Sequence, residues 1–294
     1  MRIFVTGATG FIGSAIVPDL LEAGHQVLGL ARSESGAQSL IAAGAQAQRG
    51  DLEDLDSLRR GAAMADGVIH VGFNHDFSRF AESCEADRRA IEAIGEVLEG
   101  TDKPLVVTAG LPVVAGRPAT EDDPPSQGLS PRVSEETAEA LAARGVRASV
   151  VRLPQVHDQD KHGLASYLIG IARQKAVSAY VGDGLNRWSA AHRLDVAPLF
   201  RLALDKGEAG ARYHAVAEEG VALCEIAEAI GRGLGLPVAS LPPDQMAEHF
   251  GGLAFAVATD FSAASALTQQ RLMWRPIQKH GFLSDVEQSS AYDS

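Results

Sequence analysis

Residues 5–16, VTGATGFIGSAI, carry three glycines at a spacing that suits a backbone holding a dinucleotide. Gly7, Gly10 and Gly13 stand where an apolar run ends and a segment with helical periodicity begins. Glycines at such a junction allow a tight turn, let the backbone approach a pyrophosphate, and let helix and strand pack closely. The helix N-terminus then offers unpaired N–H groups to the phosphates. Because the loop opens the first strand–helix unit, dinucleotide binding is favoured over a glycine-rich turn that binds nothing.

The segment LARSES, at the end of the second apolar run, indicates which dinucleotide is bound. An acidic residue at this point would hydrogen-bond a free ribose 2′-hydroxyl. The sequence has Ala31 and Arg32 there instead. Arg32 can pair with a 2′-phosphate, and Ser33 can add a hydrogen bond. The alternative is a solvated Arg32 paired with Glu34, but we predict NADP(H) in preference to NAD(H).

The elements that must position this loop follow a regular alternation. Five short apolar runs predict strands: RIFVTG, QVLGLA, GVIHVG, PLVVTAG and RASVVRLP. Segments with helical periodicity lie between them, and strands without polar alternation are typical of parallel sheets covered by helices on both faces. We therefore predict an α/β fold with a doubly wound parallel sheet. The pattern loosens after residue 155, which predicts a dinucleotide-binding domain at 1–155 and a smaller substrate lobe at 156–294.

The composition narrows the class of protein. The formal net charge of −12 argues against nucleic acid as a partner, since phosphate neutralisation needs clustered Lys and Arg. No apolar run reaches the ~18 residues of a membrane helix, so no membrane partner is expected. The two cysteines, Cys84 and Cys224, form no disulfide framework and no metal-ligand spacing. A reducing, cytoplasmic location is expected.

Four motifs together carry a resemblance to a known family. The motifs are TGATGFIG at the N-terminus, RGDLEDL after the third strand, VIHVG on the fourth and RLPQVH after the sixth, with the strands counted as in the family that they resemble. That family is the extended short-chain dehydrogenase/reductase superfamily, in its NAD-dependent epimerase/dehydratase branch. LTQQRLMWRPIQKHGFLSDVEQ is similar to that branch's closing segment, so the resemblance covers essentially the whole chain. It implies a Rossmann-type fold in which a segment near 187–205 returns to the first domain.

The resemblance also implies which residues surround the cofactor. The pyrophosphate would be wrapped by the glycine loop, the adenine bound after the third strand, and the nicotinamide half lined by the ends of the fourth to sixth strands. The residues that would wrap the pyrophosphate are Gly7, Thr9, Gly10, Phe11 and Ile12, and those that would bind the adenine are Asp51 and Leu52. The residues that would line the nicotinamide half are Val71, Gly72 and Phe73 after the fourth strand, Thr108 on the fifth, and Leu153, Pro154 and Val156 at the end of the sixth.

The family's acid–base residues do not occur at the matching positions. There, a helix carries Tyr and Lys four residues apart, and the cation lowers the pKa of the phenol that passes a proton to the substrate. Pro131 matches the Tyr, Glu135 the Lys, and Leu111 the family's Ser or Thr. No Tyr elsewhere in the chain has a Lys four residues later. The sequence is therefore similar to the atypical members of the superfamily.

His157 is the first alternative as a proton donor. It matches a position after the nicotinamide-facing strand, and a histidine there can donate near neutral pH. A catalytic role and a solvated loop position are equally compatible with the sequence. The same loop contains four possible metal ligands: His157, Asp158, Asp160 and His162. Lys161 lies among them and would repel a cation, so we predict no metal site. Further candidates for substrate contact are Leu111, His162, Tyr167, Trp188 and His192.

Three functions follow, in order of preference. The first is an NADP(H)-dependent oxidoreductase that reduces a carbonyl or similarly polarised double bond of a small, apolar substrate, with the proton from water or His157. The second is a non-catalytic NADP(H)-binding sensor or regulatory protein, and the third an epimerase or dehydratase. The resemblance further implies a homodimer through helices at 81–99 and 133–145, although the seven-residue spacing of Cys84, Ile91 and Leu98 suits a core-facing stripe equally well.

Overall fold

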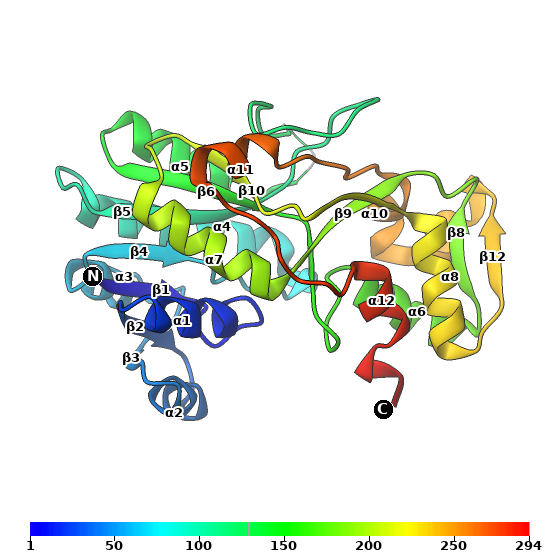
Figure 1. The fold of residues 1–294 in the computed structure, drawn as a ribbon, viewed down its shortest axis with the longest axis horizontal. Coiled ribbons are helices and arrows are strands. Elements are labelled where there is room, and N and C mark those ends of the chain that lie inside the picture. Colours follow the sequence, from blue (N-terminus) through cyan, green and yellow to red (C-terminus); the bar gives the residue numbers. More distant parts are fainter. Residues whose placement is uncertain (127, 129, 294) are drawn as a thin grey trace.

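A parallel sheet of seven strands forms the larger of two lobes in the computed structural model, which describes residues 1–126, 128 and 130–293 (Figure 1). Its strand order is β10-β6-β5-β4-β1-β2-β3, so the order reverses between β1 and β4. Ligands of such sheets bind at this reversal, outside the carboxyl ends of the strands. The strands are β1 (Arg2–Thr6), β2 (Gln26–Ala31), β3 (Gln46–Arg49), β4 (Gly67–His70), β5 (Pro104–Gly110), β6 (Arg147–Leu153) and β10 (Arg212–His214).

The predicted doubly wound α/β fold is confirmed. The five apolar runs form β1, β2, β4, β5 and β6, and their residues are buried almost throughout. The edge strands β3 and β10 contain no such run: β3 is partly exposed along its length, and β10 has only three residues, of which Tyr213 and His214 are buried.

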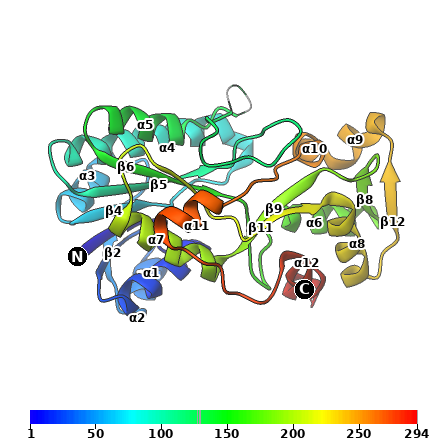
Figure 2. The ribbon, with the colours of Figure 1, turned by 45° about the horizontal axis from the view of Figure 1, so that its top comes forward.

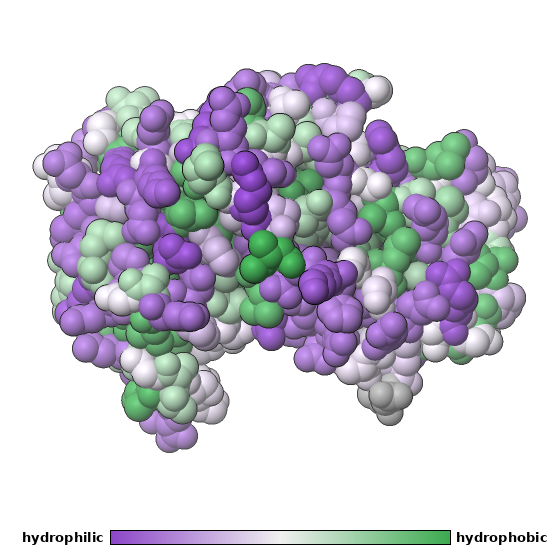
Figure 3. Space-filling model, in the orientation of Figure 1, coloured by the Kyte–Doolittle hydropathy of each residue, from purple (hydrophilic) through white to green (hydrophobic). Residues whose placement is uncertain are grey.

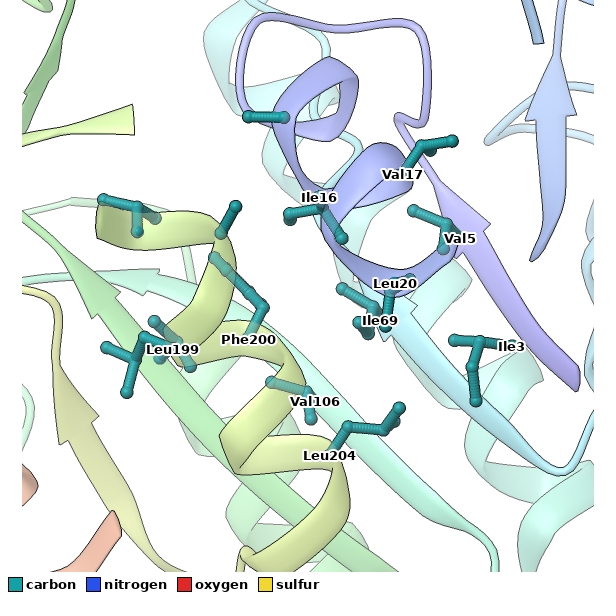
Figure 4. Close-up of a cluster of buried hydrophobic side chains, with 14 of the residues drawn as sticks. Ile3, Val5, Ile16, Val17, Leu20, Ile69, Val106, Leu199, Phe200 and Leu204 are labelled. Carbon is teal, nitrogen blue, oxygen red and sulfur yellow. The ribbon is translucent and has the colours of Figure 1, made fainter. Parts of the chain in front are cut away.

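Helices cover both faces of this sheet, as the alternation of side chains along a strand requires. Ile3 and Val5 face α1, α2 and α7, whereas Phe4 between them faces α3, α4 and α5. On the first face, side chains of α1 and α7 meet above β1, β4 and β5 (Figure 4). The helices are α1 (Gly13–Glu22), α2 (Glu34–Ala42), α3 (Leu55–Ala63), α4 (Phe80–Leu98), α5 (Ser134–Ala143) and α7 (Arg193–Lys206).

The second lobe lies beside the sheet lobe (Figure 2). It has its own core around Trp188, Ile226 and Phe282. Its strands are β7 (Gln155–His157), β8 (Ser178–Val181), β9 (Arg187–His192), β11 (Glu218–Ala222) and β12 (Val238–Leu241). Its helices are α6 (Ala165–Lys175), α8 (Leu223–Leu234), α9 (Met246–Phe250), α10 (Ala254–Ala258) and α12 (Phe282–Glu287), whereas α11 (Ala266–Leu272) packs on α7 and β10. Short 3-10 helices are η1 (Phe77–Arg79), η2 (Pro243–Gln245), η3 (Gly251–Leu253) and η4 (Ser290–Asp293).

The face shown in Figure 3 is mainly polar, with small separate apolar patches. Across the part of the chain that the structure describes, no helix combines the length and the apolar character needed to span a bilayer. Cys84, Ile91 and Leu98 of α4 are all buried within the chain itself. The core-facing explanation therefore accounts for their spacing, and the homodimer stays a prediction.

Candidate functional site

The glycine loop forms a tight corner between β1 and α1 that only glycine can occupy. Gly7 has a φ of 65°, and a Cβ atom there would lie 2.6 Å from the Cα of Gly72, which follows β4. A Cβ on Gly13 would lie 2.1 Å from the carbonyl oxygen of Gly7. Both distances are far below van der Waals contact. A side chain at Gly7 or Gly13 would therefore clash with the neighbouring backbone. This is the cradle that a dinucleotide pyrophosphate needs, and it stands at the reversal of strand order.

A pocket of ≈ 220 Å³ opens beside this corner and is lined by Thr9, Gly10, Phe11, Ser14, Asp158, Asp160, Lys161 and Arg193. The Arg193 guanidinium and the Lys161 ammonium lie 5.2 and 5.6 Å from the centroid of the Phe11 ring. Arg193 also pairs with Asp158 at 2.7 Å, which draws the 158–161 loop over the glycine corner. Two cations beside a helix N-terminus suit a diphosphate.

Lys161 and Arg193 are not among the cofactor residues predicted from the sequence. The two residues lie on separate loops of the second half of the chain, and nothing in the local sequence of either points to the glycine corner. Only their packing on Phe11 brings them there.

At the end of β2, Arg32 has 75% of its side chain exposed and lies 3.7 Å from the Asp51 carboxylate. Its partner is thus Asp51, whereas Glu34 lies 4.0 Å from Arg49. Ser33 caps α2 by accepting a hydrogen bond from the Gly36 N–H at 3.0 Å. Because the Arg32 guanidinium is exposed, it can turn toward a ligand. Its contact with a 2′-phosphate stays a prediction.

The other predicted cofactor residues gather at the carboxyl edge of the sheet. Thr108 on β5 is buried and donates a hydrogen bond to the carbonyl oxygen of His70 at 3.0 Å. A Cβ on Gly72 would meet the Leu52 side chain at 3.0 Å, so the loops after β3 and β4 touch each other. Val71 and Phe73 follow β4, and Leu153, Pro154 and Val156 lie at the β6–β7 junction; Ile12 precedes α1.

The positions matching the family's Tyr and Lys do not share a helical face. Helix α5 begins at Ser134, so Pro131 lies outside it and is exposed. Glu135 is buried and turned toward the sheet, with Nη2 of Arg152 at 2.5 Å and Nε of Arg212 at 2.8 Å. Leu111, at the third matching position, is half-buried and packs with Ala119 and Val216. None of these groups can perform the acid–base work of a phenol beside an ammonium.

Arg132, next to Pro131, places a cation at the end of β5. Its guanidinium stacks 4.2 Å from the centroid of the Phe73 ring. Nε donates to the Ser134 hydroxyl at 2.7 Å, and Nη2 donates to the Thr108 carbonyl oxygen at 3.1 Å. Arg132 is not among the site residues predicted from the sequence, although it immediately follows the position matched to the Tyr.

A chain of buried polar groups connects Arg132 to the first strand. Ser134 donates to one oxygen of Asp87, and the other oxygen lies 3.1 Å from Nε2 of His70. Nδ1 of His70 is 2.9 Å from the Thr6 hydroxyl, so His70 is a buried core histidine. Burial opposes ionisation of Asp87, but the hydrogen bond and charge of His70, the charge of Arg132 and the Ser134 hydrogen bond outweigh it and hold its pKa below the ordinary value.

His157 is not a solvated loop residue, which corrects one of the two alternatives given above. Its side chain is 1% exposed, and Nδ1 lies 2.7 Å from a carboxylate oxygen of Asp285 on α12. Burial lowers its pKa to about 4, although Asp285 opposes that shift. A neutral, enclosed imidazole bound to a carboxylate favours a role in holding α12 over a role in proton donation.

The remaining substrate candidates are dispersed. Trp188 is buried in the second lobe and donates its indole N–H to the Ala256 carbonyl oxygen. His162 is also buried, with Nε2 2.7 Å from the Ser289 hydroxyl. Nδ1 of His192 accepts from the Leu194 N–H and caps α7, whereas Tyr167 on α6 is 46% exposed. As the chain is folded here, Trp188 and His162 present no surface to a ligand.

The ligand-type residues of the 157–162 loop do not converge on one point. Asp158 pairs with Arg193, and Asp160 accepts a hydrogen bond from Ser290 at 2.6 Å. His157 and His162 bind Asp285 and Ser289, as described above. Over residues 1–126, 128 and 130–293, no group of three or more His, Cys, Asp and Glu side chains could hold a metal ion.

Comparison with known proteins agrees with this geometry. The model of the NAD dependent epimerase/dehydratase family matches residues 3–107. An uncharacterized protein of Schizosaccharomyces pombe is 50% identical over 99% of this chain and 100% of its own length. The 2′-dehydrokanamycin reductase of Streptomyces kanamyceticus is 28% identical over 88% of this chain and 74% of the relative.

Solved structures agree on the fold. The UDP-glucose 4-epimerase of Thermus thermophilus, in complex with NAD, superposes with a TM-score of 0.74 at 22% identity, covering 99% of this chain and 98% of that one. Its likeness extends over both lobes. The glycine corner also lies where the strand order reverses, between β1 and β4. From this geometry and these matches we conclude that the chain belongs to the NAD dependent epimerase/dehydratase family, a family of NAD(P)-dependent enzymes within the extended short-chain dehydrogenases/reductases.

Proposed function

We propose that the protein is an NADP(H)-dependent oxidoreductase that reduces a carbonyl or similarly polarised double bond of a small organic substrate. The observation that carries the proposal is the closed glycine corner with Lys161 and Arg193 beside it, which fits a dinucleotide diphosphate. A relative that aligns with most of the chain is named as a reductase, which supports the same class of reaction.

The residues present fit the cofactor. Gly7 and Gly10 would hold its diphosphate together with Arg193, and Thr108 lies at the strand end where the nicotinamide half would rest. When bound, the nicotinamide supplies a hydride. Reduction places that hydride on the carbonyl carbon, moves the π electron pair to oxygen, and requires one proton to complete the alcohol.

The preference for NADP(H) rests on positive charge at the ends of β2 and β3. The exposed Arg32 follows β2, and Ala31 pairs in register with Arg49 of β3, so two guanidinium groups flank this edge. Ser33 and Ser35 lie next to them with their hydroxyls 3.0 Å apart. A 2′-phosphate would gain charge-assisted hydrogen bonds from such a group of donors.

Water is the favoured proton source. His157, the other candidate, is enclosed and bound to Asp285. A positioned general acid contributes about 10²–10⁴ in rate, so a reductase without one is slowed but still competent. Epimerase and dehydratase chemistry depends more heavily on the absent Tyr, and we rank it last.

The test saturates the protein with NADPH and follows its absorbance with a panel of aldehydes, ketones, imines and enones. Consumption with one class of substrate, at a rate that exceeds the uncatalysed reaction, supports the reductase. Tight NADPH binding without consumption of any compound would favour the non-catalytic sensor. Failure to bind NADPH or NADH would contradict both.

A further inference from the structure

Arg132 holds a fixed position at the carboxyl end of β5, with part of its guanidinium unused by the protein. Nε and Nη2 donate to Ser134 and Thr108, and the Phe73 ring covers one face. Among the residues that the structure describes, none accepts a hydrogen bond from Nη1. The side chain is 22% exposed. The arrangement leaves one pair of N–H groups, already oriented, for a ligand.

A buried carboxylate and an aromatic ring both lie against Arg132. The Asp87 carboxylate lies 3.6 Å from Nε and is buried. The Phe73 ring lies 4.2 Å from the guanidinium and also contacts the His75 ring, with the two ring centroids 5.2 Å apart. The pKa of His75 is lowered by burial and further by the positive charges of Arg132 and Lys161. Asp87 and Phe73 therefore hold the guanidinium in place and leave Nη1 available to a ligand.

We propose that Nη1 of Arg132 binds a carboxylate of the substrate, so that the substrates are small carbonyl compounds that also carry a carboxylate, in place of the apolar substrate that the sequence suggests. The proposal rests on the reductase function proposed above and names its substrate class. Arginine forms short, charge-assisted hydrogen bonds with carboxylates, and stacking on Phe73 prevents the guanidinium from turning away.

A phosphate of the cofactor is the other source of an anion for Arg132. Nη2 of Arg132 binds the carbonyl oxygen of Thr108 on β5, and β5 is separated from β1 by β4; neighbouring strands lie about 4.8 Å apart, so this acceptor lies roughly 10 Å from β1, the strand that leads into the glycine corner. Lys161 and Arg193 already serve that corner. These positions favour the substrate as the source of the anion.

The Ser134 hydroxyl makes Arg132 a preorganised group. It accepts from Nε of Arg132 and donates to Asp87, and so links the cation to the buried carboxylate. Ser134→Ala removes this link and leaves the charge of Arg132 in place. We expect that variant to weaken carboxylate binding severalfold, less than loss of the guanidinium itself.

Oxamate, an unreactive carboxylate with a neighbouring carbonyl, is a suitable probe for the intact protein. Isothermal titration, with and without NADP⁺, is expected to show oxamate binding to the natural protein and at least about tenfold weaker binding to Arg132→Gln. Arg144→Gln is the matched control. Arg132 precedes helix α5, and Arg144 follows the same helix at its other end, is exposed and pairs with Glu99. Oxamide, which has no charge, should not bind to any of the proteins.

The possible results separate this inference from the proposed function. Equal binding of oxamate to Arg132→Gln and the natural protein, or no binding to either, overturns the subsite. An Arg132→Gln variant that keeps its melting temperature but binds NADPH tenfold more weakly would assign Arg132 to the cofactor instead. If NADPH does not bind at all while oxamate binds through Arg132, the reductase function fails and the carboxylate site stands.

Discussion

Glu135 Oε1 lies 2.5 Å from Nη2 of Arg152, and both side chains are almost completely buried. The position that matches the family's lysine thus carries a carboxylate that belongs to the interior of the sheet lobe. Arg212 approaches the same oxygen and also pairs with Glu139. This network ties α5 to β6 and β10, so Glu135 has a structural role in this helix.

Removing that carboxylate should destabilise the protein. In Glu135→Ala, Arg152 keeps a buried charge without its closest partner, and such losses cost about 3–5 kcal/mol. The free energy of unfolding in urea measures the effect. Glu136→Ala is the matched control, because Glu136 is the next residue of the same helical turn and is only half-buried. Equal stability of the two variants would show that the Glu135 pair contributes nothing.

A methyl group in the glycine corner should abolish cofactor binding. In Gly13→Ala, the new Cβ would meet the Gly7 carbonyl oxygen at 2.1 Å, so the loop must open. We expect a loss of about 1–3 kcal/mol in stability and no detectable NADPH binding by fluorescence. Gly170→Ala, in helix α6 with no atom within 4 Å of the added Cβ, should instead gain about 1 kcal/mol. Unchanged NADPH affinity in Gly13→Ala would exclude this corner as the phosphate site.

Arg32 should determine the choice between the two nicotinamide cofactors. Loss of a charge-assisted hydrogen bond costs about 1.5–3 kcal/mol, so Arg32→Gln should weaken NADPH binding about 10–100-fold and leave NADH binding nearly unchanged. Arg60→Gln, an exposed arginine on α3, controls for the loss of net positive charge. An equal effect on NADPH and NADH, or none on either, would remove Arg32 from the 2′-phosphate site.

Stability should fall in mild acid because buried histidines have lowered pKa values. Burial lowers the pKa values of His157 and His214 to about 4. An unfolded histidine titrates near pH 6.5, so between pH 6.5 and 4 the unfolded chain binds more protons, and stability is lost as the pH falls through that range. The fully developed effect is on the order of 3 kcal/mol for each group.

Tryptophan fluorescence during urea unfolding at pH 7.5, 6 and 5 can measure this dependence. Trp274 and Trp188 are buried in the cores of the two lobes and report on each. His157→Asn should reduce the pH dependence, whereas His280→Gln, at an exposed position, should not. A stability that does not change from pH 7.5 to 5 would contradict the burial of these imidazoles in solution.

Local sequence determined much of this protein. The glycine spacing at Gly7, Gly10 and Gly13 predicted the tight corner between β1 and α1 because backbone sterics act over a few residues. Apolar runs predicted the central strands because burial on both faces excludes polar side chains. The absence of a Tyr–Lys pair was also visible in the sequence, and the structure adds where the substituted residues point.

Tertiary structure decided the rest of the site. Arg132 becomes a fixed cation only because Phe73, Thr108 and Asp87, from three other segments, meet it. His157 is enclosed by Asp285, 128 residues later in the chain. No local sequence pattern encodes such long-range contacts, because they arise from the packing of whole helices and strands. The same packing determines the burial that shifts each pKa.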